Sequence, residues 1–358
     1  MSYTESEAYQ REIAEQYKER NLELEPVEVK GILSQLGIEV DEADIHVAEA
    51  GNMNATFIAG DYVVKVSDKK DLVSYGANDI VSEQLVDEKA IKVVEYDVRE
   101  KTGYEVLVME RAPGTMWLPV MPEMSEEENK RLFAEVLQVV TATKGMKATD
   151  KFGWVNDIIV NPEKDGFDTH QEQLEARLSS YLRKIEAQAD LDQEAVSRLA
   201  SYVRERLDLF SEDIPSFVHT DLHMGNIMQQ DGELTAVIDW DSAQSAPMYR
   251  GMVSLIGLID NPAQFVEGTP NYSAYKGKKF EYLYPLLRQA YTEELTDPKL
   301  AEKLNVMGII DGLMWVADDW SKEWSKEMIA NLVTKELAAN GDMSQTYYGQ
   351  VLEKMKKT

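Results

Sequence analysis

The sequence predicts an α+β protein with two lobes, a small antiparallel β lobe followed by a larger, mainly helical lobe. Short β-rich runs separated by turn residues crowd the region from about residue 44 to residue 110. After residue 111 the apolar residues recur mostly with helical periodicity, apart from one hairpin-like stretch over residues 217–243. With 358 residues, the chain has enough material for about two lobes with their own cores.

The composition excludes several classes of protein. The formal net charge is −28, so we expect the protein to repel nucleic acids and anionic membrane surfaces. This charge suits solubility or the attraction of a cationic small molecule. The chain has no cysteine, no apolar run long enough to span a bilayer and a polar start without a secretory signal, so we expect a cytoplasmic protein without disulfides or a membrane segment. No feature of the sequence predicts an oligomeric state.

The small lobe and a helical extension are predicted within the first 110 residues. Residues 1–40 are expected to form the extension, because the apolar residues of "VEVKGILSQLGI" follow helical spacing up to Gly37. Residues 41–110 are expected to form the β-rich lobe. Its strands are predicted in the runs "IHVAEA", "ATFIAG", "YVVKVS", "KVVEYDVRE" and "YEVLVME", and a helix is predicted in "ANDIVSEQLVDEKAI" between the third and fourth runs.

Residues 111–358 are predicted to form the helical lobe, which a connector from Arg111 to Gly114 joins to the small lobe. Helical periodicity is found over residues 124–145, 169–210, 276–295 and 298–339. The stretch "FVHTDLHMGNIMQQDGELTAVIDWDSA" interrupts this pattern and sets acidic and amide side chains between short apolar runs. Polar groups of this number would destabilise a buried core, so we expect the stretch to line a cleft.

The dipeptide Asp231-Gly232 is a strong signal for a two-residue hairpin turn. A turn centred there is expected to pair Gln230 with Glu233, Met228 with Thr235, and Asn226 with Val237. Because side chains alternate along a strand, Asn226 and Asp239 would then lie on one face as diagonal neighbours, within about 7–8 Å of each other.

Asp221, in the loop that enters the hairpin, adds a third oxygen donor near the same point. Carboxylate and amide oxygens are the ligands that Mg²⁺ prefers. The order His-x-Asp-x-x-x-x-Asn, followed by a strand that ends in Asp, is that of kinases, where the loop Asp handles the acceptor proton and the other two residues hold metal. We therefore expect Asp221 to be catalytic and Asn226 and Asp239 to bind Mg²⁺.

The segment "HTDLHMGNIM…AVIDWDSA" closely resembles the aminoglycoside phosphotransferase and choline kinase family of small-molecule kinases. Members carry patterns such as H-G-D-x-H-x-G-N followed by I-D-[WF]-[DEG], and the resemblance extends over most of the chain from about residue 44. It implies a protein-kinase-like fold in which residues 41–110 bind the nucleotide and residues 111–358 carry catalysis and acceptor binding. Many members have a further Asp shortly after the metal Asp, whereas "SAQSAPMYRGMVSL" contains no acidic residue, which weakens the link to the best-known antibiotic kinases.

The resemblance also implies a lysine that binds the nucleotide phosphates. Lys65 in "YVVKVS" is the expected residue, and an edge-strand lysine that faces water is the alternative. Glu83 on the following helix is expected to orient Lys65 through an ion pair, with Asp79 and Glu88 as rivals on the same helix.

Two further segments are implied to contact the nucleotide. In "EAGNMNATF", Gly51 would let the backbone approach the phosphates and Asn52 or Asn54 would donate hydrogen bonds. In "LVMERAPG", the adenine ring would bond backbone groups between Glu110 and Ala112.

The expected function is therefore an ATP-dependent, Mg²⁺-requiring phosphotransferase, with GTP as an alternative donor. Its acceptor would be a hydroxyl group of a small molecule, and the acidic charge favours an amine-bearing acceptor such as an aminoglycoside or an amino alcohol. The alternative is a catalytically silent kinase-like protein that binds a ligand or a partner.

Three other patterns suggest competing sites. His219 and His223 have the four-residue spacing of a zinc pair on a helix, but no third ligand follows and "MGN" is a poor helix former. Asp239-Trp240-Asp241 could hold a metal with a sugar nucleotide, but this would leave Asp221 and Asn226 unexplained. If it does not, Asp241 is expected to assist the metal or the acceptor, or to be solvated.

Along "IIDGLMWVADDWSKEW" one helix face carries Asp311, Trp315 and Asp319. This face is either a wall that recognises a cation or part of an amphipathic surface helix with its tryptophan in the core.

Overall fold

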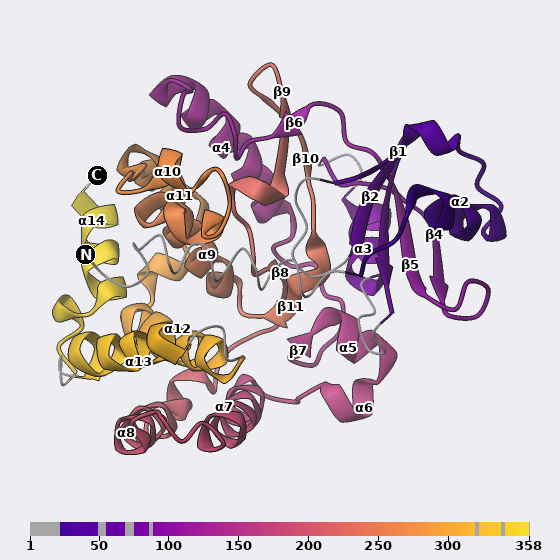
Figure 1. Cartoon of the computed structure of the whole chain (residues 1–358). Helices are drawn as coiled ribbons and strands as arrows, with labels where there is room; N and C mark the ends of the chain where they lie inside the picture. The colour runs from indigo at the N-terminus through magenta and orange to yellow at the C-terminus, as the bar shows by residue number, and fades with distance from the viewer. Residues whose placement is uncertain are drawn as a thin grey trace.

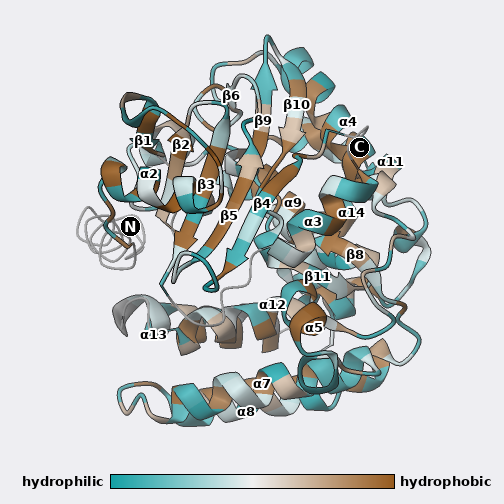
Figure 2. Cartoon of the chain, turned by 90° about the vertical axis from the view of Figure 1, so that its right-hand side faces the viewer, coloured by the Kyte–Doolittle hydropathy of each residue, from teal (hydrophilic) through white to brown (hydrophobic). Residues whose placement is uncertain are grey.

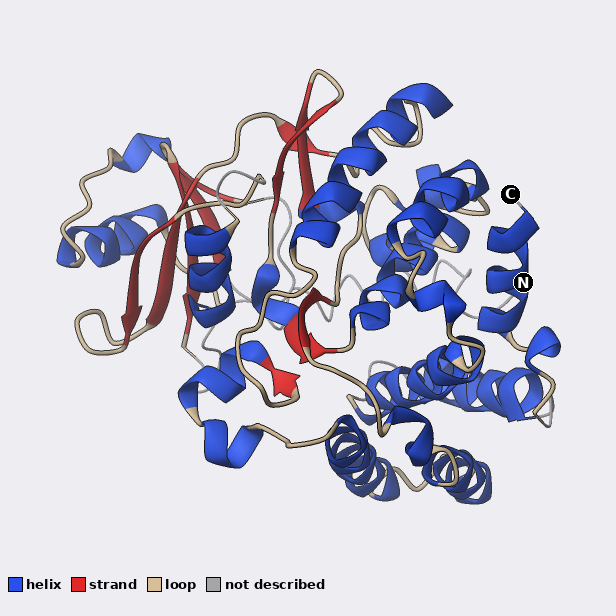
Figure 3. Cartoon of the chain, turned by 180° about the vertical axis from the view of Figure 1, so that it is seen from behind, coloured by secondary structure: helices blue, strands red, loops and turns tan. Residues whose placement is uncertain are grey.

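The computed structural model describes residues 22–48, 55–68, 75–85, 89–318, 322–337 and 341–357. A small antiparallel sheet forms one lobe, and helices make up most of the other, as the α+β prediction expects (Figure 1). Figure 3 shows the same division from behind, with the strands of the small sheet on one side and most of the helices on the other.

The small lobe contains a five-stranded antiparallel sheet with the strand order β1-β2-β3-β5-β4. Its strands are β1 (Ile45–Val47), β2 (Ala55–Ala59), β3 (Tyr62–Ser67), β4 (Val93–Val98) and β5 (Glu105–Glu110). Lys65 pairs with Thr56 on one side and Leu107 on the other, so it lies in the middle strand and not on an edge. Figure 2 shows brown hydrophobic segments along β3 and β5, at the centre of this sheet.

Helix α2 (Pro26–Gln35) packs against this sheet. Val29 and Leu33 are fully buried and share a hydrophobic cluster with Phe57 and Val64 of the sheet. Pro26 occupies the first helical turn, and Glu25 forms a capping box with Glu28, which explains where the helix begins. The helix therefore belongs to the core of the small lobe, while the proposed division near residue 40 stays a prediction.

Helix α3 (Tyr75–Gln84) lies between the small sheet and the large lobe, where it contacts β4 and α5 (Val155–Val160). It is shorter than the predicted helical segment, which continued to residue 91. Its buried face consists of Gly76, Ala77, Asn78, Val81 and Ser82.

The connector after β5 leads into β6 (Thr115–Met116), which pairs with β9 (Ile227–Gln230). Gly114 has a positive φ of 87°, and a Cβ atom there would lie 2.1 Å from the carbonyl oxygen of Gln229. Only glycine fits this close backbone approach, which fixes the path between the lobes.

The predicted hairpin is present, with β9 paired to β10 (Glu233–Val237) and the turn at Asp231 and Gly232. Both turn residues have positive φ, 54° and 79°, as a type I′ turn requires. Gln230 pairs with Glu233 as expected.

The register beyond the turn differs from the prediction by one residue. A bulge between Leu234 and Ala236 places Met228 opposite Ala236, and Val237 opposite Ile227. Thr235 is the extra residue, and its hydroxyl donates a hydrogen bond to the carbonyl of Pro113 at 2.7 Å. The Ile238 N–H donates to the Asn226 carbonyl at 2.9 Å, so the two ends that carry Asn226 and Asp239 still meet.

A second small sheet in the large lobe has the order β7-β11-β8. Its strands are β7 (Gly153–Trp154), β8 (Ser216–His219) and β11 (Ala243–Ala246). The main helices are α4 (Glu126–Ala142), α7 (His170–Glu186), α8 (Gln193–Arg204), α9 (Met252–Asp260), α11 (Tyr284–Ala290), α12 (Leu300–Ala317), α13 (Lys322–Asn331) and α14 (Tyr347–Lys357), with short helices α6 (Pro162–Asp165) and α10 (Tyr272–Tyr275).

These helices follow the predicted segments with interruptions. The segment 169–210 contains α7, α8 and a short 3₁₀ helix, and the segment 298–339 contains α12, α13 and the π-helical turn Leu332–Leu337. The segment 276–295 contains the 3₁₀ helix Glu281–Leu283 followed directly by α11, and it ends in the 3₁₀ helix Glu294–Thr296. In the described part of the chain, no helix is long and apolar enough to cross a membrane.

Candidate active site

The loop between β8 and β9 is cross-linked to the strand that precedes Asp239. His219 is buried; its Nδ1 accepts the Asp221 N–H at 3.3 Å, and its Nε2–H donates to the Ile238 carbonyl at 3.1 Å. A backbone N–H can only donate, so the proton of the neutral ring lies on Nε2. The Asn226 amide donates to the Asp221 carbonyl at 2.8 Å, which closes the loop on itself.

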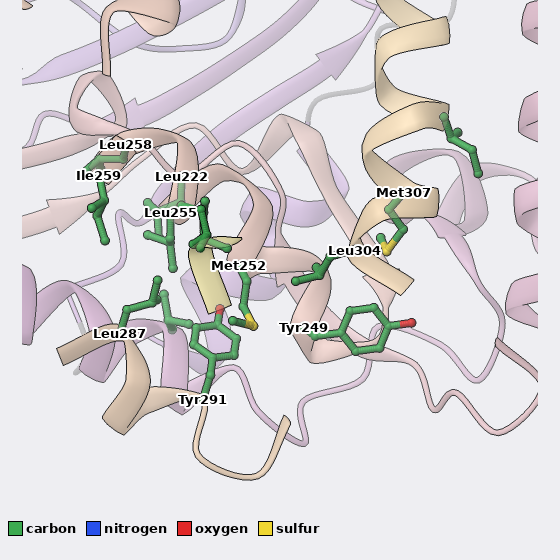
Figure 4. Packing of buried hydrophobic residues seen from close by; sticks show 14 of the residues in the cluster. Leu222, Tyr249, Met252, Leu255, Leu258, Ile259, Leu287, Tyr291, Leu304 and Met307 are labelled. Atoms are coloured by element: carbon green, nitrogen blue, oxygen red, sulfur yellow. The ribbon is translucent and has the colours of Figure 1, made fainter. Parts of the chain in front are cut away.

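Leu222 anchors this loop in the core of the large lobe. Its side chain is buried among Met252 and Leu255 of α9 (Figure 4), and its N–H donates to the Ser254 hydroxyl at 3.3 Å. The adjacent Asp221 side chain is 48% exposed. The loop therefore buries Leu222 and presents the preceding residue, Asp221, to solvent.

The Asp221 carboxylate forms no hydrogen bond to another described residue, and it lies 3.8 Å from His223 Nε2. Desolvation by the surrounding protein, with a smaller contribution from the negative charge of Asp239, raises the pKa of Asp221 to about 7, although His219 and Arg250 oppose the shift. Such a carboxylate can take up a proton near neutral pH.

Lys65 of the small lobe reaches the loop that follows β10 in the large lobe. Its ammonium donates to Asp239 Oδ1 at 2.7 Å and to Asp241 Oδ2 at 2.8 Å, and its side chain is only 12% exposed. Burial alone would lower the pKa of Lys65, but the two carboxylates together raise it above its ordinary value. Burial likewise works against the charged form of Asp239, whose pKa is nevertheless lowered by the Lys65 ammonium.

Asp239 has a left-handed backbone conformation with φ 64° and ψ 57°. This region is unfavourable for residues with a Cβ atom, although Asp tolerates it better than most. Such conformations persist where the surrounding structure fixes them, and they are common at functional sites.

Asn226 and Asp239 fit the oxygen-ligand chemistry of Mg²⁺. Asn226 uses its Nδ2 for the Asp221 carbonyl, and Asp239 holds Lys65 through Oδ1. No described residue donates to Oδ1 of Asn226 or to the other oxygen of Asp239, so both can bind a cation. Over the described ranges there is no group of three or more His, Cys, Asp and Glu side chains that could hold a metal. A cation here would therefore complete its shell with phosphate oxygens and water, as Mg²⁺ commonly does.

The zinc alternative does not fit the structure. Both ring nitrogens of His219 are engaged, Nδ1 by the Asp221 N–H and Nε2 by the Ile238 carbonyl, and Nδ1 of His223 accepts the Gly225 N–H at 3.0 Å. His223 stacks on the Phe265 ring with centroids 4.7 Å apart, and desolvation lowers the pKa of His223 to about 4. Both side chains act within the protein scaffold and not as a zinc pair.

The prediction that Glu83 orients Lys65 is wrong for this structure. Glu83 is exposed on α3 and forms no ion pair with any described residue, whereas Lys65 pairs with Asp239 and Asp241. The reason is helical phase, because the buried face of α3 carries Asn78 and Val81 and turns Glu83 outward. The rival Asp79 does not pair with Lys65 either, and Glu88 lies outside the described residues.

The other predicted nucleotide contacts are divided between described and undescribed residues. Gly51, Asn52 and Asn54 lie outside the described part of the chain. Glu110 ends β5, and its N–H donates to the Lys92 carbonyl at 2.9 Å. Ala112 is buried, and its backbone groups form no hydrogen bond to any described residue, which leaves them for a ligand.

Asp311 of α12 is not available as part of a cation-recognising wall. It accepts hydrogen bonds from Arg250 at 3.0 Å and from Arg177 at 3.4 Å, so two guanidinium groups already neutralise it. Trp315 is 41% exposed and does not fill the core, and Asp319 lies outside the described residues.

A small β lobe that presents a lysine to an Asp-Asn-Asp set on a helical lobe defines the class of kinase-like phosphotransferases. The model of the phosphotransferase enzyme family matches residues 44–272, which is more than half of the chain, and the chain belongs to this family. The family resemblance and the fold predicted from the sequence are thereby confirmed. None of the curated proteins matches the sequence.

Solved structures of aminoglycoside phosphotransferases share the fold. One is a thermostable mutant of aminoglycoside phosphotransferase APH(4)-Ia in a ternary complex with AMP-PNP and hygromycin B, with a TM-score of 0.54 and 16% identity over 92% of this chain and 98% of that chain. Another is the streptomycin-ATP-APH(2")-IIa ternary complex, with a TM-score of 0.54 and 16% identity over 88% of this chain and 98% of that chain.

Proposed function

We propose that this protein transfers the γ-phosphoryl group of ATP to a hydroxyl group of a small molecule. The observation that carries the proposal is the half-exposed carboxylate of Asp221, which accepts no hydrogen bond from the described residues and is held in a loop that is hydrogen-bonded to Asn226 and to the strand before Asp239. Lys65 reaches Asp239 itself from the other lobe. The similar structures that contain ATP or AMP-PNP support ATP as the donor, and GTP is the alternative.

Each residue of the set has a distinct role in the proposed reaction. Lys65 would bind the phosphate oxygens of the nucleotide, and Asn226 and Asp239 would hold Mg²⁺, which neutralises negative charge on the transferred group. Asp221 would orient the acceptor hydroxyl and take its proton. The hydroxyl oxygen bonds to the γ-phosphorus while the bond between that phosphorus and the bridging oxygen of the β-phosphate breaks. Positioning supplies most of the acceleration, because the transition state is largely dissociative.

The nucleotide would lie between the sheet and this loop. The backbone groups of buried Ala112, which no described residue bonds, would bond the adenine edge together with Glu110. Gly51 and Asn54 remain proposed contacts to the phosphates.

The acceptor would carry an amine as well as a hydroxyl. A net charge of −28 attracts cations, and the similar structures contain hygromycin B or streptomycin. A catalytically silent protein is the alternative, but it would not need the pre-formed set of Lys65, Asp221, Asn226 and Asp239.

A screen of acceptors with magnesium-ATP tests the proposal. Amino sugars and amino alcohols are incubated with the protein, and release of ADP is measured. We expect at least one acceptor to be phosphorylated, and Asp221→Ala to abolish turnover while magnesium-AMP-PNP still binds. Asp150→Ala, at an exposed position, is the control and should behave like the wild type.

Two results would contradict the proposal. Binding of ATP without phosphorylation of any acceptor would favour the silent protein. Loss of nucleotide binding together with activity in Asp221→Ala would assign a structural role to Asp221.

A further inference from the structure

Asp241 joins the phosphate-binding lysine to the helix beside it. Its Oδ2 accepts the Lys65 ammonium at 2.8 Å, and its Oδ1 accepts the Asn78 amide of α3 at 2.8 Å. Asn78 is 4% exposed, and Asp241 is 22% exposed. One carboxylate thus fixes the lysine of β3 and a helix of the small lobe to the loop after β10.

Asn156 of α5 forms a second link between α3 and the same loop. Its Oδ1 accepts the Ala77 N–H at 2.8 Å, and its Nδ2 donates to the Asp241 carbonyl at 3.1 Å. Ala77 lies in the first turn of α3, where backbone N–H groups lack a partner within the helix. Asn156 therefore supplies a needed acceptor and holds the Asp241 backbone at the same time.

The two helices approach each other closely at this point. A Cβ atom at Gly76 would lie 2.9 Å from Ile159 Cδ1 and 3.3 Å from Asn156 Oδ1. The glycine therefore allows α3 to lie where Asn78 reaches Asp241.

The charges show why Lys65 has two partners. Asp239 and Asp241 share one ammonium group, so the three side chains carry one excess negative charge. When Asp239 coordinates Mg²⁺, Asp241 remains as the carboxylate that balances Lys65. Glu83, which the sequence predicted to orient Lys65 through an ion pair, is exposed on the far side of α3.

We propose that Asp241 is the positioning residue that orients Lys65 toward the nucleotide phosphates, and that Asn78 transmits the position of α3 to this pair. The proposal rests on the proposed nucleotide-binding function. Asp241 lies two positions after Asp239, the proposed metal ligand. The proposal gives Asp241 the task of orienting Lys65, which the sequence suggested for Glu83. A movement of α3 would then change nucleotide affinity through Asn78 and Asp241.

Calorimetric titration with nucleotide tests the proposal without knowledge of the acceptor. Wild type, Asp241→Asn and Glu83→Gln are titrated with magnesium-AMP-PNP, and with ADP in EDTA. We expect Asp241→Asn to weaken both ligands about tenfold, because the amide cannot balance the lysine charge. Glu83→Gln should stay within about twofold of wild type.

The titration in EDTA separates positioning from metal binding. If Asp241 were a metal ligand, its loss would weaken only the magnesium complex, and the proposal would be overturned. Equal affinities of Asp241→Asn and wild type, or a weakened Glu83→Gln, would overturn it as well. Failure of the wild type to bind either nucleotide would instead contradict the proposed function.

Two more variants cover the case in which Asp241→Asn does not fold. Asp241→Glu keeps the charge and should recover part of the affinity, and Asn78→Ala should weaken both ligands about threefold without loss of secondary structure. Wild-type affinity in Asn78→Ala would remove α3 from the proposed link.

Discussion

At the scale of single residues, the environment of Asp221 decides which proton chemistry is available. Its side chain is half exposed and lacks a hydrogen-bond partner among the described residues, while its backbone is held by His219 and Asn226. A carboxylate arranged in this way is fixed in position and free to bind a hydroxyl group. Its raised pKa makes it a stronger base than an ordinary carboxylate.

The pKa of Asp221 predicts how activity depends on pH. Only the ionised carboxylate can accept the hydroxyl proton, and desolvation raises its pKa to about 7. We therefore expect kcat/KM to be constant above about pH 8 and to fall about tenfold per pH unit well below pH 7. The measurement is a pH–rate profile with saturating magnesium, accompanied by the Kd of ADP over the same range. A profile that stays flat down to about pH 5 would contradict this role, because it would imply an ordinary carboxyl pKa.

Single residues can be placed from the sequence where a local backbone signal, such as a turn dipeptide, fixes the path of the chain. The hairpin turn at Asp231 and Gly232 is confirmed, and the Ile238 N–H bonds the Asn226 carbonyl, although the expected register is shifted by one residue. Prediction from the sequence fails at Glu83, since Ala77 and Val81 define the buried face of α3 and Glu83 lies about 240° around the helix from Ala77. The same helical periodicity places Asn78 on the buried face, and this was the signal that could have identified it.

At the scale of elements, Asp311 connects three parts of the large lobe. It lies on α12 and bonds Arg177 of α7 and Arg250 of the 3₁₀ helix Met248–Gly251, directly before α9. Arg250 is buried, and its Nε and Nη1 have no hydrogen-bond partner among the described residues. The carboxylate is therefore the group that compensates two largely buried positive charges.

Removal of this carboxylate charge should destabilise the protein. We expect Asp311→Asn to lower the free energy of unfolding by about 3 kcal/mol, because two guanidinium groups lose their counter-charge in a mostly buried place. Urea denaturation measures the change. Asp318→Asn at the end of the same helix removes an exposed ion pair with Lys184 and should cost less than about 1 kcal/mol. Equal losses in both variants would show that burial at Asp311 has no special effect.

The order of strands and helices was largely predictable, whereas one register was not. The runs of β-branched residues predict β2, β3 and β5 well, because the sheet buries them. The bulge at Thr235 depends on a hydrogen bond to Pro113, which lies 122 residues earlier in the chain. A contact between such distant segments leaves no local pattern in the sequence.

At the scale of the whole molecule, the net charge destabilises the folded state, and the contact between the lobes stabilises it. A net charge of −28 makes the folded protein repel itself, while Lys65 joins the lobes through Asp239 and Asp241. The lysine contributes a positive charge where two acidic side chains would otherwise repel each other. Lys65 is thus one link between the lobes, beside the hydrogen bonds that join α3 to Asp241 and Asn156.

Salt should stabilise the protein, because screening weakens the repulsion among its acidic groups more than it weakens the buried pair. We expect Tm to rise by a few degrees as sodium chloride increases from about 10 mM to about 200 mM, over which the Debye length falls from about 30 Å to under about 10 Å. Thermal denaturation followed by circular dichroism measures this. A lower Tm in salt would show that attractive surface pairs outweigh the repulsion.

A crystal structure with magnesium-AMP-PNP tests the central claim most directly. We predict that Mg²⁺ lies about 2.1 Å from Asn226 Oδ1 and from an oxygen of Asp239, that Lys65 contacts the phosphates, and that the Asp221 carboxylate faces the γ-phosphate. A nucleotide bound elsewhere, or a metal ion bound without Asn226 and Asp239, would contradict it.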